Sequence, residues 1–296
     1  MGGMAHPTSW FASPDDAAAR LAEQGYLTDA STATTAYLAG ALEKPLLVEG
    51  PAGVGKTELA KAVARVTGAE LVRLQCYEGL DEARALYEWN YKKQLLRIQA
   101  SQGQGEQSWE QTHDDIFTDE FLLTRPLLTA IRRDQPTVLL VDEVDKTDVE
   151  VEGLLLEVLS DFQVTIPELG TVEAVRRPFV VLTSNATREL SEAVKRRCLY
   201  LHLDYPDAER EREIVTSQVP DLEDRVARTL VDVVHRLREL ELKKAPSIAE
   251  SVDWARTLVA LEIRALDPTA VNDTHGLILK HASDHEKAVR ELKFAG

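Results

Sequence analysis

Eight consecutive residues, GPAGVGKT at positions 50–57, have the types and the spacing needed to surround a chain of phosphates. Main-chain N–H groups can point inward around phosphate oxygens only where side chains leave room, and glycine provides that room. Lys56 adds a cation for the β- and γ-phosphates, and Thr57 offers a hydroxyl to Mg²⁺. The motif G-x-x-x-x-G-K-[ST] is matched at every position. It predicts a nucleotide site made of Gly50, Pro51, Ala52, Gly53, Val54, Gly55, Lys56, Thr57 and Glu58.

A second set of reactive side chains stands at the end of an apolar run, VLLVDE at 138–143. Side chains at the carboxyl end of a parallel strand open into the ligand crevice of α/β proteins. Asp142 is placed to hold Mg²⁺ through its water shell, and Glu143 to orient and deprotonate an attacking water molecule. A glutamate directly after the aspartate favours ATPases over GTPases. With the glycine loop, the acid pair predicts an ATPase that uses ATP and Mg²⁺.

These residues need a strand before the loop, a helix after it, and a further strand that carries the acids. The apolar run 46–48 predicts that first strand, and the pattern of 57–66 predicts the helix. Alternating Tyr87, Trp89 and Tyr91 indicate a short strand. Other strands are expected at 70–75, 137–143, 162–167 and 176–185. Other helices are expected at 14–42 with a break near 29–31, at 92–99, 119–133, 148–160 and 189–197, and a polar loop is expected at 101–115.

Beyond residue 205 the mixed strand and helix pattern gives way to a helical one, which covers almost all of residues 207–264. We therefore predict an α/β P-loop NTPase fold with a parallel-sheet core and a C-terminal helical lid. The core with its N-terminal helices is expected over residues 1–204, and the lid with a C-terminal tail over 205–296.

Composition limits the kinds of partner and the cellular location that we expect. The chain has 34 Lys and Arg against 50 Asp and Glu, a net charge of −16, so phosphate backbones repel it and nucleic acid is an unlikely partner. Cys76 and Cys198 match no metal-ligand spacing and are expected to be reduced. The N-terminus lacks the features of a signal peptide, and no stretch approaches the roughly 20 apolar residues that span a bilayer. We expect a cytoplasmic protein with no membrane partner.

The whole set resembles an AAA+ ATPase, and specifically the MoxR family, over roughly residues 40–265. Within that family the chain is most similar to the CoxD-like group, ATPases associated with carbon monoxide dehydrogenase and related molybdenum hydroxylases. The finer match is carried by LVEGPAGVGKTELAKA, LQCYEGLDEARALYEWNYKKQLL, RRCLYLHLDYP and SIAESVDWA.

The resemblance implies roles for four more residues. Asn185, which ends VVLTSN, would sense the γ-phosphate beside Glu143. Arg196 or Arg197 would reach the site of a neighbouring subunit in a homo-oligomeric ring, expected to be a hexamer; which of the two does so stays open. Related ATPases often carry a lid arginine where this chain has Ala249, and Arg256 is the possible substitute.

The resemblance also implies that insertions face the ring pore or a partner, and 77–115 and the hairpin-like 162–180 are the candidates. The aromatics at 87–91 would grip a client or pack as one strand face. A chaperone-like ATPase is the leading hypothesis, one that matures a metalloenzyme client of the molybdenum hydroxylase type, with a von Willebrand factor A-type partner. A nucleic-acid-directed AAA+ motor and a nucleotide-gated switch with negligible turnover are the alternatives.

Overall fold

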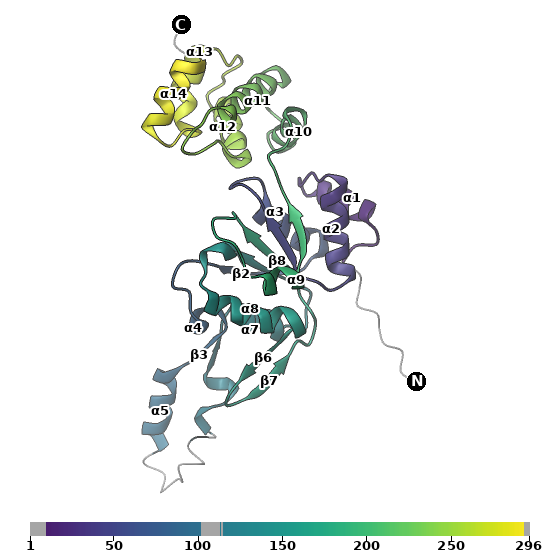
Figure 1. The fold of residues 1–296 in the computed structure, drawn as a ribbon, viewed down its shortest axis with the longest axis vertical. Helices are drawn as coiled ribbons and strands as arrows, with labels where there is room; N and C mark the ends of the chain where they lie inside the picture. The colour runs from purple at the N-terminus through teal and green to yellow at the C-terminus, as the bar shows by residue number, and fades with distance from the viewer. Residues whose placement is uncertain (1–9, 102–112, 114, 293–296) are drawn as a thin grey trace. The chain divides into compact units, whose positions relative to one another are not determined.

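The computed structural model describes residues 10–101, 113 and 115–292 (Figure 1). The chain divides into two compact units, and one division falls between Leu201 and His202, three residues before the boundary predicted between 204 and 205. The first unit holds residues up to 21, 28–49 and 59–201, and the second holds 22–27, 50–58 and the chain from 202 onward. Residues 50–58 of the glycine loop are therefore grouped with the C-terminal helices in the second unit.

The first unit is built on a five-stranded sheet with the strand order β2-β5-β8-β1-β9. β1 pairs with β8, β8 with β5, and β5 with β2, and each of these pairs is parallel. β5 and β8 are buried along their whole length, as expected where both faces of a parallel sheet are covered. This confirms the predicted α/β P-loop fold. The strands are β1 (Leu46–Glu49), β2 (Glu70–Gln75), β5 (Thr137–Asp142), β8 (Phe179–Ser184) and β9 (Leu199–His202).

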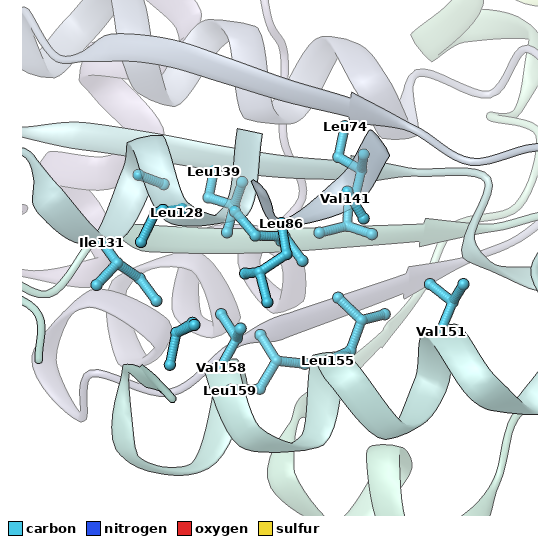
Figure 2. Packing of buried hydrophobic residues seen from close by; sticks show 14 of the residues in the cluster. Leu74, Leu86, Leu128, Ile131, Leu139, Val141, Val151, Leu155, Val158 and Leu159 are labelled. Carbon is cyan, nitrogen blue, oxygen red and sulfur yellow. The ribbon is translucent and has the colours of Figure 1, made fainter. Parts of the chain in front are cut away.

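Helices cover this sheet through apolar faces with helical spacing. On α8, the buried residues Val151, Leu155 and Val158 point toward the sheet, where Leu139 and Val141 of β5 lie (Figure 2). Positions i, i+4 and i+7 share one side of a helix, so this spacing buries a continuous apolar face. The helices of this part are α1 (Pro14–Glu23), α2 (Ala30–Ala41), α3 (Lys56–Thr67), α7 (Pro126–Arg132), α8 (Val149–Asp161) and α9 (Glu192–Arg197), with the 3₁₀ turn η2 (Val144–Lys146).

The insertion after β2 differs from two of our predictions. Tyr91 is the first residue of helix α5 (Tyr91–Ser101) and is 65% exposed, so it does not share a strand face with Tyr87 and Trp89. Trp89 is buried in β3 (Tyr87–Trp89), with its ring centroid 5.0 Å from that of Phe117. The prediction that all three aromatics lie on one strand is therefore wrong for Tyr91, and a role in gripping a client stays a prediction.

The helix expected at 119–133 is also wrong in its first half. A 3₁₀ turn η1 (Asp119–Phe121) leads into β4 (Leu122–Thr124), and α7 begins only at Pro126. β4 pairs antiparallel with β3, and this tertiary pairing overrides the local helical pattern. Proline at the first helical position then fixes the start of α7. A short helix α4 (Glu82–Ala85) precedes β3, and most of the predicted polar loop 101–115 lies outside the described residues.

The hairpin expected within 162–180 is present as β6 (Gln163–Ile166) and β7 (Gly170–Glu173), which pair antiparallel. The second unit contains the predicted helical lid around a core that includes Trp254, whose indole donates to Thr274 at 2.8 Å. Its helices are α10 (Ala208–Gln218), α11 (Asp224–Glu239), α12 (Ile248–Ala260), α13 (Pro268–Thr274) and α14 (Ala282–Leu292), with the turn η3 (His275–Leu277). None of the helices in the described ranges has both the length and the apolar character that crossing a bilayer requires.

Candidate functional site

The glycine loop follows β1 directly and runs into α3, and two of its glycines have no room for a side chain. Gly50 has φ +152°, and a Cβ there would lie 1.9 Å from the carbonyl oxygen of Leu203. Gly53 has φ +77°, and its Cβ would lie 2.1 Å from the Cβ of Ser247. The motif thus requires glycine for two reasons: a left-handed backbone and close contact with the residues around the lid.

Lys56 is the first residue of α3 and is 6% exposed. Its ammonium donates to the carbonyl oxygens of Gly50 and Pro51, both at 2.7 Å. These contacts fold the cation back over its own loop, at the amino end of a helix where anions are favoured. Thr57 and Glu58 follow in the first turn of α3, half-buried. The loop therefore presents a lysine, a hydroxyl and helix N–H groups in the order that phosphate binding requires.

The lid contacts this loop through the main chain. The Ile248 N–H, at the start of α12, donates to the carbonyl of Gly53 at 3.2 Å, and the Tyr205 hydroxyl donates to the carbonyl of Ala52 at 3.3 Å. Burial raises the pKa of Tyr205, which keeps the hydroxyl protonated as a donor. The Arg238 guanidinium lies 4.3 Å from the centroid of the Tyr205 ring, a cation–π distance.

Arg238 is held in turn by a buried carboxylate. Glu211 of α10 is fully buried and accepts hydrogen bonds from Arg238 at 2.5 and 2.9 Å and from Ser251 at 2.7 Å. His235 Nε2 lies 2.9 Å from the same carboxylate. A charge this deeply buried is tolerated because it is paired and hydrogen-bonded. The network ties α10, α11 and α12 to the residue that contacts the glycine loop.

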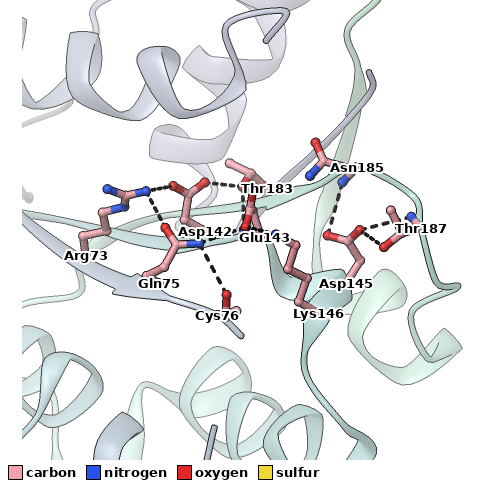
Figure 3. Close-up of polar contacts among 10 residues, drawn as sticks. All are labelled: Arg73, Gln75, Cys76, Asp142, Glu143, Asp145, Lys146, Thr183, Asn185 and Thr187. Atoms are coloured by element: carbon pink, nitrogen blue, oxygen red, sulfur yellow. Dashed lines mark hydrogen bonds and ion pairs between the residues drawn. The ribbon is translucent and has the colours of Figure 1, made fainter. Parts of the chain in front are cut away.

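In the first unit, Asp142 ends β5 and its side chain is 3% exposed. One carboxylate oxygen accepts from the hydroxyl of Thr183 at 2.5 Å, and the other accepts from the guanidinium of Arg73 at 2.5 Å (Figure 3). Arg73 lies on β2 and Thr183 on β8, the two strands that flank β5. Sequence reasoning predicted Asp142 but missed both partners.

Glu143 follows in a left-handed conformation, φ +58° and ψ +48°, which is uncommon for a residue with a side chain. Its N–H donates to the Thr183 hydroxyl at 2.9 Å, which supports this backbone turn. The carboxylate accepts from the Gln75 amide at 3.0 Å and from Lys146 at 2.6 Å (Figure 3). The hydrogen bond to Glu143 raises the pKa of Lys146. Glu143 is thus held in place and one-third exposed, as a base that must meet water requires.

A third carboxylate, Asp145, which the sequence analysis missed, connects η2 to the segment after β8. It is 3% exposed and accepts from the N–H of Asn185 at 3.2 Å, the N–H of Thr187 at 3.1 Å and the Thr187 hydroxyl at 2.5 Å. Burial opposes its ionisation, but these hydrogen bonds together outweigh burial and lower the pKa of Asp145. Asp145 therefore fixes the backbone of Asn185, whose side-chain amide points away from it in Figure 3.

The arginines differ in their surroundings. Arg196 is 81% exposed and lies 3.9 Å from Glu192 on its own helix. Arg197, by contrast, donates to the Ser160 hydroxyl and to the carbonyl of Ala193, the latter at 3.0 Å. Arg256 is also exposed and lies 3.3 Å from Asp253. It is eight residues beyond the start of α12, about 12 Å along the helix axis, so its role toward nucleotide stays a prediction.

The donor set suits Mg²⁺ bound with a nucleotide. In residues 10–101, 113 and 115–292, no cluster of three His, Cys, Asp or Glu side chains is arranged as a metal cage. Mg²⁺ does not need one, because it takes one or two carboxylates and completes its shell with phosphate oxygens and water. Asp142, at the end of β5, could supply such a carboxylate.

The missed partners left a weak trace in the sequence. Arg73 and Gln75 are two residues apart at the end of a strand, so they share one face of it. The sequence around Arg73 and Gln75 does not indicate their contacts with the acid pair. Those contacts follow only once β2 is known to lie beside β5, in the register Gln75↔Asp142. Cys76 is next; its N–H donates to the carbonyl of Asp142 at 2.8 Å, and burial raises the pKa of its thiol to about 12. Cys76 and Cys198 are both free thiols.

Comparisons with known proteins bear on the family and the fold. In sequence, the chain is 26% identical over 227 residues to a protein of Staphylococcus aureus described only as uncharacterised, covering 74% of this chain and 77% of that protein. A Staphylococcus haemolyticus protein matches to the same extent. In structure, the fold is similar to a mutant of RuvB from Thermotoga maritima, with a TM-score of 0.51, 16% identity, and coverage of 98% of this chain and 81% of that one. The family model "AAA domain (dynein-related subfamily)" matches residues 45–198, which is more than half of the chain. The chain therefore belongs to the dynein-related AAA domain family.

Proposed function

We propose that this protein is an ATP-hydrolysing AAA+ machine that couples turnover to the remodelling of a client protein. The observation that carries the proposal is the glycine loop with its buried Lys56, which donates to the loop carbonyls at 2.7 Å. A glycine-rich loop at the amino end of a helix is a recurring arrangement for binding phosphates. The acid pair at the end of β5 adds the groups for hydrolysis.

The proposed division of labour follows from the chemistry of each side chain. The loop and Lys56 bind the phosphates, and Thr57 and Asp142 hold Mg²⁺, which neutralises phosphate charge when bound. Glu143 accepts a proton from the attacking water, which then adds to the γ-phosphorus as ADP leaves. Asn185, with its backbone fixed by Asp145, orients that water.

Arg196 is the better candidate for the arginine that acts on a neighbouring subunit. Its guanidinium is 81% exposed, whereas Arg197 is engaged by Ser160 and Ala193 of its own chain. An arginine supplied in trans requires a homo-oligomeric ring, which we propose to be a hexamer. The client is proposed from sequence resemblance: a molybdenum-containing hydroxylase, with a von Willebrand factor A-type protein as a further partner.

Two substitutions test the enzymatic part. Glu143→Gln should keep ATP affinity and lose turnover by at least 10²-fold, the range seen when a general base is removed. Lys56→Ala should lose nucleotide binding itself. Calorimetry with ATP and Mg²⁺ measures nucleotide binding by both variants, and phosphate release measures their turnover.

Lys61→Ala, on the same helix α3 but outside the motif, is the matched control for Lys56→Ala. A wild type that hydrolyses ATP no faster than Glu143→Gln would indicate a nucleotide-gated switch. A wild type that takes up no adenine nucleotide would refute the proposal. The Glu143→Gln protein with ATP is also the form in which to capture the molybdenum hydroxylase client.

A further inference from the structure

The carboxylate proposed to bind metal is already paired with a cation. The Arg73 guanidinium donates to Asp142 at 2.5 Å, and the same nitrogen donates to the Gln75 side-chain oxygen. The side chain of Asp142 is 3% exposed, while that of Arg73 is 48% exposed. A buried carboxylate therefore depends on a cation that itself remains in contact with water.

We propose that Arg73 occupies the place of the divalent ion in the nucleotide-free protein and must leave Asp142 when the ion binds. The two cations compete for one carboxylate, because a guanidinium and a hydrated Mg²⁺ repel each other when both contact the same side chain. This inference rests on the proposed function, since it concerns the metal that accompanies the nucleotide.

The competition is physically reasonable for both partners. Asp142 would be costly to leave unpaired, because a buried charge without a partner loses its hydration with nothing in return. Arg73 is half exposed and its stem starts from β2, so its guanidinium can return to water and keep Gln75 as a hydrogen-bond acceptor. Thr183 stays on the other oxygen of Asp142 and preserves its orientation.

Two other side chains near the pair contact Glu143 instead of Asp142. Lys146 binds Glu143 at 2.6 Å, and the Gln75 amide binds the same carboxylate at 3.0 Å. Arg73 is the residue whose contact lies on the metal ligand itself. It is a positioning residue: it orients Asp142 without touching the nucleotide, and it weakens metal binding in the absence of phosphates.

The expected size of the effect follows from the strength of the contact. A hydrogen bond to a charged group is stronger than one between neutral groups. If that contact holds the free protein mostly in the paired state, apparent metal affinity falls in proportion to the unpaired fraction. Removing the guanidinium should therefore lower the metal concentration for half-saturation by about tenfold, the equivalent of roughly 1.4 kcal/mol.

The experiment measures Mn²⁺ binding in the presence of ADP, by the loss of the free Mn²⁺ signal in electron paramagnetic resonance. Arg73→Gln should half-saturate at about one-tenth of the wild-type concentration. Arg73→Lys keeps a cation, but one with a shorter reach and a single point of charge. Its half-saturation concentration should lie between those of the wild type and Arg73→Gln. Arg133→Gln is the control, because it removes an arginine paired with Glu70 at the opposite end of β2.

The outcomes separate the inference from the function on which it rests. Half-saturation by Arg73→Gln within twofold of Arg133→Gln, or at higher Mn²⁺, overturns the competition while leaving nucleotide binding by the wild type intact. A wild type that binds no Mn²⁺ with ADP overturns both. Should Arg73→Gln fail to fold, Arg73→Lys decides: half-saturation at or above the wild-type concentration contradicts the proposal.

Discussion

At the scale of single residues, the site depends on polar side chains that hold the proposed catalytic groups in place. Thr183 contacts both members of the acid pair, through the Asp142 carboxylate at 2.5 Å and the Glu143 N–H at 2.9 Å. The left-handed backbone of Glu143 is thereby fixed before any ligand arrives. Pre-organisation of this kind lets a base act without reorganising during the reaction.

Asp145→Asn tests one of these supports. An amide replaces one of the two acceptor oxygens with an NH2 donor, so it can no longer accept from both the Asn185 and the Thr187 N–H groups, and unfolding free energy at pH 7 should fall by about 1–3 kcal/mol. Because the folded pKa of Asp145 is lowered, its contribution is present above the unfolded value near 3.9 and disappears as pH falls through the folded pKa. Urea unfolding at pH 7 and near pH 3 measures both.

The control is Asp148→Asn, an exposed residue before α8 whose side chain makes no capping hydrogen bond. The gap between wild type and Asp145→Asn should shrink at the acidic pH, and ATP turnover should fall because Asn185 is displaced. An equal gap at both pH values would show that the stabilisation does not come from the ionised carboxylate.

At the scale of elements, the lid contacts the glycine loop where a lid arginine is missing. Ala249 stands in the first turn of α12, so no cation extends from that position. The start of the same helix instead meets Gly53, through the Ile248 N–H and the Cβ of Ser247. Movement of the loop would therefore reach α12 through main-chain packing.

Gly53→Ala should weaken ATP binding at least tenfold, because its Cβ would overlap Ser247 in addition to straining a backbone at φ +77°. Gly68→Ala is the matched control: Gly68 has φ +66°, but a Cβ there meets nothing within 4 Å. Adding Ser247→Gly to Gly53→Ala should recover part of the affinity, since glycine is tolerated at a helix start. Calorimetry decides, and equal losses in the two alanine variants would refute the contact.

At the scale of the whole molecule, the proposed ring makes each site depend on a neighbour. Arg196→Ala should lower turnover by about 10³-fold or more, the effect of an arginine finger in GTPases. Arg197→Ala should lower it far less, because Arg197 binds Ser160 and Ala193 of its own chain. Phosphate release measures both variants.

Mixing provides the stricter check. Arg196→Ala subunits keep an intact Glu143, and Glu143→Gln subunits keep an intact Arg196. Mixed rings should therefore regain activity that neither protein has alone, and light scattering with ATP and Mg²⁺ should find oligomers in both. A mixture as inactive as its components, or a strict monomer in every nucleotide state, would contradict trans action.

The sequence by itself determined the parts of this protein whose signals are local. The loop at 50–57, the acids at 142 and 143, the parallel-sheet core and the lid helices follow from short-range patterns, because glycine requirements, buried runs and helical periodicity are properties of neighbouring residues. Tertiary structure decided what depends on pairing between distant segments. β4 formed against β3 where a helix was expected, and Arg73, Thr183 and Asp145 met the site across gaps of 40 to 69 residues. No periodicity encodes such contacts, since they exist only once the strand order places β2 and β8 on either side of β5.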